Sequence, residues 1–223
     1  MQRHTGQKFK VRAVMIDLDG TLIDTAPEIA RAANTMLTSL GQQALATKQI
    51  EAYIGEGAGV LVKRCLAGEP ETELFVEAQQ LFFAHYAQIA VESKPYAGAL
   101  EAVQALQMAG YQLACVTNKS ASFTLPLLEV NALLPYFDLV VSGDTLQRKK
   151  PEPDQIFYTC EKFGVPVSEA LLIGDSGTDI AAARSAGCYV FTVPYGYNQG
   201  REIAASSVDA IISNLSEVLH LIH

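Results

Sequence analysis

The sequence lacks any grouping of cysteines that would indicate a zinc site or a disulfide framework. Its four cysteines are Cys65, Cys115, Cys160 and Cys188, and they form no C-x-x-C pair and have no matching histidine cluster. Zinc sites and small disulfide-bonded domains depend on such groupings. We therefore expect reduced, mostly buried thiols.

The chain also lacks an apolar run long enough to span a membrane. A basic start, from Arg3 to Arg12, is not followed by a clean apolar stretch, because Asp17 and Asp19 interrupt it. This pattern fits neither a secretory signal nor a membrane anchor. A cytoplasmic location is the default expectation.

The sequence has fewer basic than acidic residues. The 223 residues include 16 Lys and Arg against 24 Asp and Glu, which gives a formal net charge of -8. This is the wrong sign for a protein that neutralises nucleic-acid phosphates or anionic lipids, so neither is an expected partner. An anionic substrate would have to be bound by a metal ion and a few local cationic or backbone N–H groups.

Several short apolar runs predict strands that are buried on both faces. They cover Val11–Ile16, Gln112–Val116, Phe137–Val141, Leu171–Ile173 and Tyr189–Val193. From about residue 96 onward these runs alternate with helical patterns, which cover Ala97–Ala109, Asp154–Phe163 and Asp179–Ala186. The alternation predicts an α/β fold with a doubly wound, mostly parallel sheet and a Rossmann-like core.

The stretch Leu22–Lys94 differs, since it has no convincing strand and several helical patterns. One apolar stripe predicts a helix between Pro27 and Gly41. Further helices are expected at Thr47–Tyr53, Gly59–Leu66 and Glu71–Val91. We interpret residues 23–94 as an inserted all-helical cap domain over the active face, and residues 1–22 and 95–223 as the catalytic core.

Polar side chains follow four of the predicted strands, at the point where each strand ends. They are Asp17 and Asp19 after the first strand, Thr117 and Asn118 after the second, Lys150 at the end of a polar loop after the third, and Asp175, Ser176 and Asp179 after the fourth. Ligands of open α/β sheets bind beyond the carboxyl ends of the strands. We therefore expect these side chains to converge on one pocket.

Crowded carboxylates repel one another unless a cation is bound or some of them are protonated. Hard oxygen ligands without a His or Cys pattern favour Mg²⁺ over zinc. One carboxylate of such a site is able to attack phosphorus, and Asp17 is our candidate. Asp19 fits a general acid and base. Lys150 and the polar groups at Thr117–Asn118 would bind the remaining phosphate charge.

Each of these residues has a more ordinary interpretation when it is taken alone. An aspartate after a strand, such as Asp17 or Asp175, is usually a helix N-cap or turn residue. Thr117 with Asn118 fits a turn, and Lys150 fits a solvated surface lysine. The ordered set, with each member directly after a strand-like run, favours the catalytic interpretation.

Four motifs resemble those of the haloacid dehalogenase superfamily, in the same order along the chain. They are Asp17-Leu18-Asp19-Gly20-Thr21-Leu22-Ile23-Asp24-Thr25, Val116-Thr117-Asn118-Lys119, Lys149-Lys150-Pro151-Glu152-Pro153 and Ile173-Gly174-Asp175-Ser176-Gly177-Thr178-Asp179. The resemblance covers nearly the whole chain, because Leu22–Lys94 is also similar to that family's helical insert.

Transferred by position, the resemblance implies that Asp17 is the nucleophile and Asp19 the general acid and base. Asp17, the backbone carbonyl of Asp19, and Asp175 would bind Mg²⁺, and Asp179 would support the metal shell. The second acid, at position 19, distinguishes the phosphotransferase branch of the superfamily from its dehalogenases.

The resemblance also implies that Thr117, Asn118 and Lys150 hold the phosphoryl oxygens, and that Lys150 restrains Asp17. Thr21 stands where the related hexose-phosphate mutases often have a different residue, which favours hydrolysis.

Within the superfamily, three further segments are most similar to the bacterial phosphoglycolate phosphatases. They are Tyr53-Ile54-Gly55-Glu56-Gly57 with Leu61-Val62-Lys63-Arg64, Ser142-Gly143-Asp144, and Tyr195-Gly196-Tyr197-Asn198. This similarity implies an enzyme that hydrolyses 2-phosphoglycolate to glycolate and phosphate. That family often has Asn at the position of Glu56.

The glycine cluster at residues 55–59 lacks the G-x-G-x-x-G spacing and follows no strand, so it does not predict a dinucleotide site. We interpret it as a turned cap loop in which Gly57 faces the substrate. Arg64 would then contact a substrate carboxylate, although an exposed helix position suits this residue equally well.

Two other functions fit parts of the pattern. A sugar-phosphate phosphatase or phosphosugar mutase would use the same four motifs, because they fix the phosphoryl chemistry but not the leaving group. A non-catalytic domain that accepts a phosphoryl group would also need an acidic pocket, but it would need neither Asp19 nor a large lid. In each case the partner is a small phosphorylated molecule, and the chain is a monomer or a homodimer.

Overall fold

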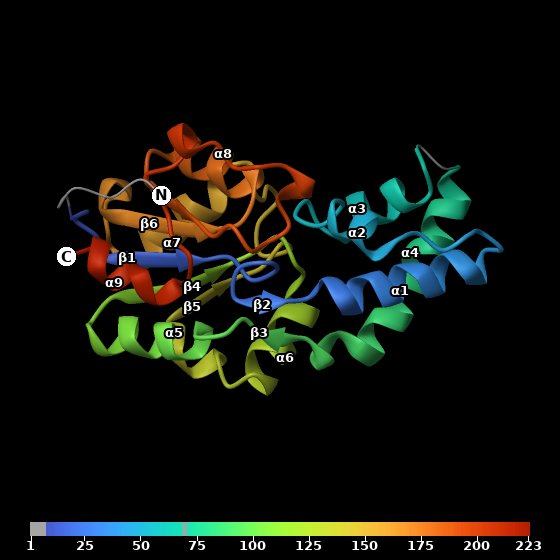
Figure 1. The fold of residues 1–223 in the computed structure, drawn as a ribbon, viewed down its shortest axis with the longest axis horizontal. Coiled ribbons are helices and arrows are strands. Elements are labelled where there is room, and N and C mark those ends of the chain that lie inside the picture. The colour runs from blue at the N-terminus through green and yellow to red at the C-terminus, as the bar shows by residue number, and fades with distance from the viewer. Residues whose placement is uncertain (1–7, 69–70) are drawn as a thin grey trace.

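The computed structural model describes residues 8–68 and 71–223, and its centre is a parallel sheet in which six strands are ordered β5-β4-β1-β6-β7-β8. The strands are β1 (Ala13–Ile16), β4 (Gln112–Val116), β5 (Leu139–Val141), β6 (Ala170–Gly174), β7 (Tyr189–Thr192) and β8 (Ala210–Ile211). In Figure 1 the strands point toward a separate group of helices, so their carboxyl ends face that group. The predicted α/β fold with a mostly parallel sheet is confirmed.

The sheet is doubly wound because successive residues of its central strands enter different cores. In β1, Val14 and Ile16 join one cluster of buried side chains, and Ala13 and Met15 join another on the opposite face. This alternation follows from the two-residue period of a strand. The helices α5 (Ala99–Met108) and α9 (Val218–Leu221) contribute to the first cluster, whereas α7 (Asp154–Phe163) and α8 (Gly177–Ala186) contribute to the second.

Sequence patterns did not predict the helix α6 (Ala121–Val130), which joins β4 to β5. Pro126 lies inside this helix, and proline is normally a sign that a helix ends. Leu127 and Leu128 are buried and attach the helix to the core cluster beside α5. Packing thus stabilises a helix that local propensity opposes.

The predicted helical insert contains α1 (Ala26–Ser39), α2 (Thr47–Glu51), α3 (Ala58–Cys65) and α4 (Thr72–Ile89). Its buried apolar residues form a cluster of their own, to which α1 and α4 contribute most of the side chains. Contrary to the expectation of no strand, β2 (Ile23–Asp24) and β3 (Lys94–Pro95) pair as an antiparallel ribbon at the two ends of this segment. Two-residue strands are too short to leave a periodic pattern in the sequence.

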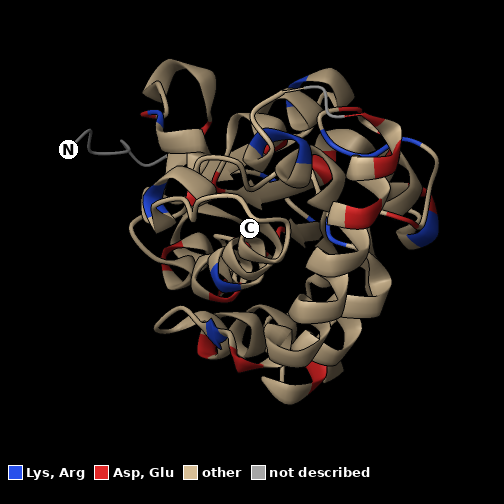
Figure 2. Ribbon diagram, turned by 90° about the vertical axis from the view of Figure 1, so that its right-hand side faces the viewer, with Lys and Arg blue, Asp and Glu red and all other residues tan. Residues whose placement is uncertain are grey.

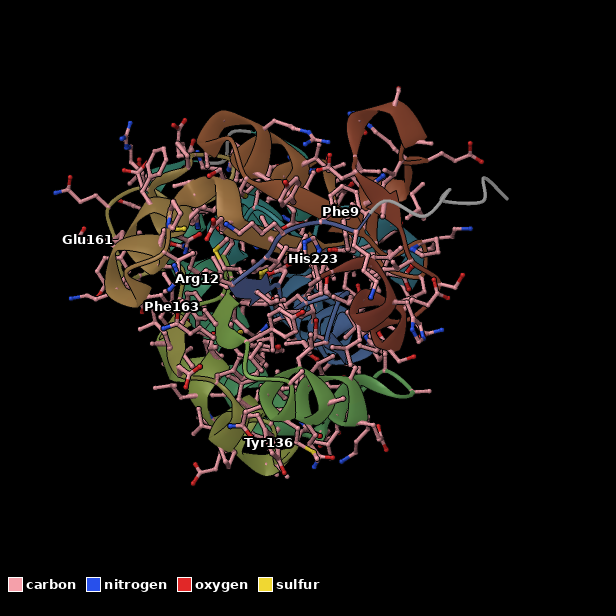
Figure 3. The ribbon with its side chains drawn as sticks, turned by 90° about the vertical axis from the view of Figure 1, so that its left-hand side faces the viewer. Phe9, Arg12, Tyr136, Glu161, Phe163 and His223 are labelled. Carbon is pink, nitrogen blue, oxygen red and sulfur yellow. The ribbon has the colours of Figure 1, made fainter. Side chains whose placement is uncertain are left out.

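At the end of the molecule away from the helical insert, Phe9 pairs with the last residues of the chain. Figure 3 views this end and shows Phe9, Arg12 and His223 close to the same edge of the sheet. The Phe9 N–H donates to the Leu221 carbonyl at 2.8 Å, and the His223 N–H donates to the Phe9 carbonyl at 3.0 Å. The first seven residues of the predicted core lie outside the described residues.

The surface of the helical insert carries both signs of charge. Figure 2 shows Lys and Arg interspersed with Asp and Glu over this side of the molecule.

All four cysteines are buried and free, as expected. In the part of the chain that the structure describes, no helix is both long and apolar enough to cross a membrane.

Candidate active site

A pocket of about 260 Å³ lies between the carboxyl ends of the strands and the helical insert. Five of the residues predicted for the site line it: Asp17, Asp19, Thr117, Asn118 and Gly57. The wall opposite Asp17 is apolar and comes from the insert and α6, with Ile29, Ile54, Leu61, Phe82, Phe83, Tyr86 and Phe123. The pocket is therefore charged on one side and apolar on the other.

Lys150 is buried and contacts three parts of the site. Its Nζ lies 2.8 Å from Asp17 Oδ1 and 2.7 Å from Asp179 Oδ1, and it donates to the Val116 carbonyl at 2.8 Å. The contacts with Val116 and Asp179 are hydrogen bonds, whereas the contact with Asp17 is an ion pair that leaves Asp17 Oδ1 without a hydrogen-bond partner among the described residues. Burial opposes the charged form of Lys150, but the two carboxylates raise its pKa above the ordinary value. This geometry suits the predicted restraint of Asp17.

Three buried aspartates, Asp17, Asp175 and Asp179, each place a carboxylate oxygen within 4.8 Å of the others. Burial raises the pKa of Asp17 to about 7, and the Asp179 charge acts in the same direction while Lys150 opposes it. Burial and the neighbouring carboxylates also raise the pKa of Asp175 well above its ordinary value. One lysine does not neutralise this cluster, so a divalent cation fits it.

Backbone geometry holds Asp175 in place from two sides. Its Oδ2 accepts a hydrogen bond from the Tyr197 N–H at 2.6 Å. Gly20, the fourth residue of the first motif, packs directly against the same carboxylate, and a Cβ there would overlap it. Gly20 also has a φ of +82°, in the left-handed region that favours glycine. The glycine of the Asp-x-Asp-Gly sequence therefore leaves the space that the Asp175 carboxylate of the fourth motif occupies.

Asp19 is paired with a lysine to which the sequence analysis gave no role of its own. The Lys119 Nζ lies 2.8 Å and 3.1 Å from the two Asp19 carboxylate oxygens, and 4.9 Å from the centre of the Tyr86 ring. Burial opposes the charge of Lys119, yet the Asp19 carboxylate raises its pKa above the ordinary value. Its position at the end of the second motif was the one sequence feature that could have indicated a role for Lys119 in the site.

Thr117 and Asn118 directly follow β4, as expected. Both are buried, and the Thr117 N–H donates to the Val141 carbonyl at 2.9 Å. The Asn118 side-chain amide donates to the carbonyls of Gly55 and Lys150, each at 2.8 Å. Asn118 therefore connects the glycine loop of the insert to the lysine loop of the core.

Arg64 does not line the pocket that Asp17, Asp19, Thr117, Asn118 and Gly57 share. Its guanidinium pairs with Glu56 at 2.5 Å, and Arg64 is not among the residues that line the pocket. Glu56 also accepts a hydrogen bond from the Gln199 side chain at 2.8 Å. In this arrangement the arginine is held by the cap loop, and its contact with a substrate carboxylate stays a prediction.

Tyr197 connects the start of the insert to the carboxylate cluster. The segment Tyr195-Gly196-Tyr197-Asn198 was singled out in the sequence, but these contacts were not predicted. The Tyr197 hydroxyl accepts hydrogen bonds from the N–H groups of Thr25 and Ala26 at 2.8 and 2.9 Å, and donates to Asp24 Oδ1 at 2.7 Å. Neither N–H group has a partner within α1, whose N-cap residue Thr25 makes no side-chain cap hydrogen bond. The backbone N–H of the same residue bonds Asp175.

The Tyr197→Phe variant is expected to unfold more easily, by about 1–3 kcal/mol, because it leaves two helix N–H groups and a carboxylate without their partner. Urea unfolding measures this difference. Tyr158→Phe is the control, because the Tyr158 ring contacts Lys162 while its hydroxyl is not needed for that contact. Equal stabilities of the two variants would contradict the role given to the Tyr197 hydroxyl.

Comparison with known proteins shows the family of this chain. The model of the haloacid dehalogenase-like hydrolases matches residues 14–193, which include all four motifs. This chain belongs to the haloacid dehalogenase-like hydrolases. It is 49% identical over 217 residues to a phosphoglycolate phosphatase of Nitrosospira multiformis, with 95% of this chain and 96% of the relative covered. It is 46% identical to a phosphoglycolate phosphatase of Thiobacillus denitrificans, with 93% of each chain covered.

Solved structures of haloacid dehalogenase-like hydrolases have the same fold. A crystal structure from Haemophilus somnus, described as a predicted phosphoglycolate phosphatase, superposes with a TM-score of 0.90 at 32% identity and covers 95% of this chain and 97% of its own. The agreement extends over the sheet and the helical insert together, because so much of both chains is covered.

Proposed function

We propose that this hydrolase is a Mg²⁺-dependent phosphatase whose substrate is 2-phosphoglycolate and whose products are glycolate and phosphate. The observation that carries the proposal is the placement of Asp17, the residue directly after β1, beside the Lys150 ammonium group and the carboxylates of Asp175 and Asp179. The relatives named phosphoglycolate phosphatase support the choice of substrate, since their identities reach 49% over most of the chain.

The first step forms a bond from a carboxylate oxygen of Asp17 to phosphorus and breaks the bond from phosphorus to the glycolate oxygen. Lys150 fixes the attacking carboxylate. Asp19 gives its proton to the departing oxygen, so that glycolate leaves as the alcohol. The buried Lys119 ammonium group, which pairs with the Asp19 carboxyl in this structure, would have to move away for that transfer.

In the second step Asp19, now a carboxylate, takes a proton from a water molecule as that water attacks phosphorus. The bond between phosphorus and the Asp17 oxygen breaks, which releases phosphate and restores both carboxyl groups. The Thr117 hydroxyl and the Asn118 backbone N–H would donate to the phosphoryl oxygens, because the Asn118 side-chain amide already donates to two carbonyls.

Asp17, Asp175 and the backbone carbonyl of Asp19 would hold the Mg²⁺ ion, and Asp179 would support them. The hard oxygen donors and the raised pKa values of two of these carboxyls fit a divalent cation. When bound, the ion supplies charge neutralisation for the phosphoryl group and the crowded carboxylates. We also propose that residues 23–94 form a cap domain that excludes water from the pocket during the first step.

Phosphate release from 2-phosphoglycolate, compared with a panel of sugar phosphates, tests the proposal. We expect release that requires Mg²⁺, prefers 2-phosphoglycolate and disappears in EDTA. Faster release from sugar phosphates would keep the mechanism and replace the substrate. No release from any compound would favour a mutase or a phosphate-accepting domain.

The stability of the metal-free protein should depend on pH in a direction that the raised pKa of Asp17 sets. Because that pKa is about 7 rather than 3.8, the folded state holds a proton between these values that the unfolded state has released. The metal-free protein therefore loses stability as pH rises from about 4 to 7. Added Mg²⁺ should raise the unfolding temperature more at pH 8 than at pH 5, as scanning fluorimetry would show.

A further inference from the structure

We propose that Lys149 binds the carboxylate of the substrate, an inference that rests on the proposed function. A substrate with a phosphate at one end and a carboxylate at the other needs a second cationic group on the far side of the pocket from the phosphoryl site. Lys149 lines the pocket together with Asp17 and Asp19. It is the neighbour of Lys150 in sequence, but the two ammonium groups have different surroundings.

The ammonium group of Lys149 reaches the cap loop. A Cβ on Gly57 would overlap the Lys149 Nζ, so the lysine head lies directly against this glycine. Gly57 has a φ of +93° and precedes α3, whose first turn has no acidic residue and no side-chain cap. The missing side chain at position 57 thus leaves the space that the ammonium group occupies, on the rim where the core meets the insert.

Lys149 has no competing anion. Among residues 8–68 and 71–223, no ion pair or hydrogen bond of the structure involves its ammonium group. The side chain is partly buried rather than exposed to bulk water. A half-buried cation without a counter-charge at a pocket wall is suited to an anionic ligand.

Two other cationic groups near the pocket, and one helix start, already have partners. The Lys119 ammonium pairs with Asp19, and Arg64 pairs with Glu56. The start of α6 is occupied as well, because Asp144 accepts a hydrogen bond from the Ala121 N–H at 2.9 Å. Lys149 is therefore the lining cation left to meet a carboxylate without first breaking an ion pair.

The test compares two substrates of similar size, 2-phosphoglycolate and ethyl phosphate, which has a methyl group in place of the carboxylate. Lys149→Met should raise the KM for 2-phosphoglycolate by about 10- to 100-fold, with a small change in kcat, because a charge-assisted contact is lost. Hydrolysis of ethyl phosphate should change by less than about twofold. Lys149→Arg should restore most of the affinity for 2-phosphoglycolate.

Two matched arginine variants complete the experiment. Arg148→Met removes an exposed cation of the same loop, which pairs with Asp154, and should leave both KM values unchanged. Arg64→Met tests the competing site in the cap. A selective loss of 2-phosphoglycolate binding in Arg64→Met but not in Lys149→Met would overturn the proposal, and so would equal losses on both substrates in Lys149→Met.

The failures of the two proposals are distinct. A wild-type enzyme that hydrolyses other phosphate esters but not 2-phosphoglycolate would refute the proposed function and the role of Lys149 with it. A wild-type enzyme that prefers 2-phosphoglycolate, combined with an unimpaired Lys149→Met variant, would refute only the role of Lys149.

Discussion

Replacing Asp17 with asparagine is expected to abolish turnover, by at least about four orders of magnitude, while it stabilises the metal-free protein. Turnover ends because an amide is a poor nucleophile toward phosphorus. Stability rises because the substitution removes a buried carboxylate whose pKa is raised to about 7. At pH 8 we expect the unfolding temperature in EDTA to increase by at least about 3 °C.

Two measurements on the same preparation separate this result from misfolding. Single-turnover phosphate release gives the loss of activity, and thermal unfolding in EDTA at pH 5 and pH 8 gives the gain in stability. The gain should be smaller at pH 5, where the wild-type carboxyl is protonated. A variant that is inactive and less stable at both pH values would contradict the electrostatic account.

The second large effect is expected from Lys150→Met. The side chain is 2% exposed and lies within 2.8 Å of two carboxylates, so its removal leaves two buried negative charges facing each other. Breaking a buried ion pair from one side typically costs about 3–5 kcal/mol of stability. The loss should be greatest at pH 8 and smaller at pH 5, where Asp17 takes up a proton.

Chemical unfolding at both pH values measures this effect. Lys149→Met is the matched control, because it removes the neighbouring lysine, which has no ion pair among the described residues. It should alter stability by less than about 0.5 kcal/mol. A Lys150→Met variant whose loss of stability did not change with pH would show that packing, rather than charge, dominates this position.

The sheet and its polar strand ends were predictable because the relevant signals are local. Strands buried on both faces require continuous apolar runs, and the chemistry of an open sheet is confined to the residues that follow them. Asp17, Thr117 and Asp175 could be named for this reason. The boundaries of α7 were predicted to the residue, since Gly164 ends that helix in the left-handed conformation.

The side-chain partners of the insert could not be predicted from the sequence. Arg64 has the pattern of a pocket residue, but its partner Glu56 is set by the three-dimensional course of the loop. The Tyr197 hydroxyl meets α1 across more than 170 positions of the chain. Such pairings depend on tertiary packing, which leaves no periodic signal in one sequence.

Tyr197 contacts two different parts of the molecule, one through its side chain and the other through its backbone. Its ring hydroxyl holds the first turn of α1, and its backbone N–H holds Asp175. A rotation of the insert about β2 that pulls on the hydroxyl therefore also displaces a group of the carboxylate cluster. Thermodynamic linkage makes this coupling reciprocal. If one orientation of the insert strengthens the binding of an ion, then binding of that ion stabilises the same orientation by an equal free energy.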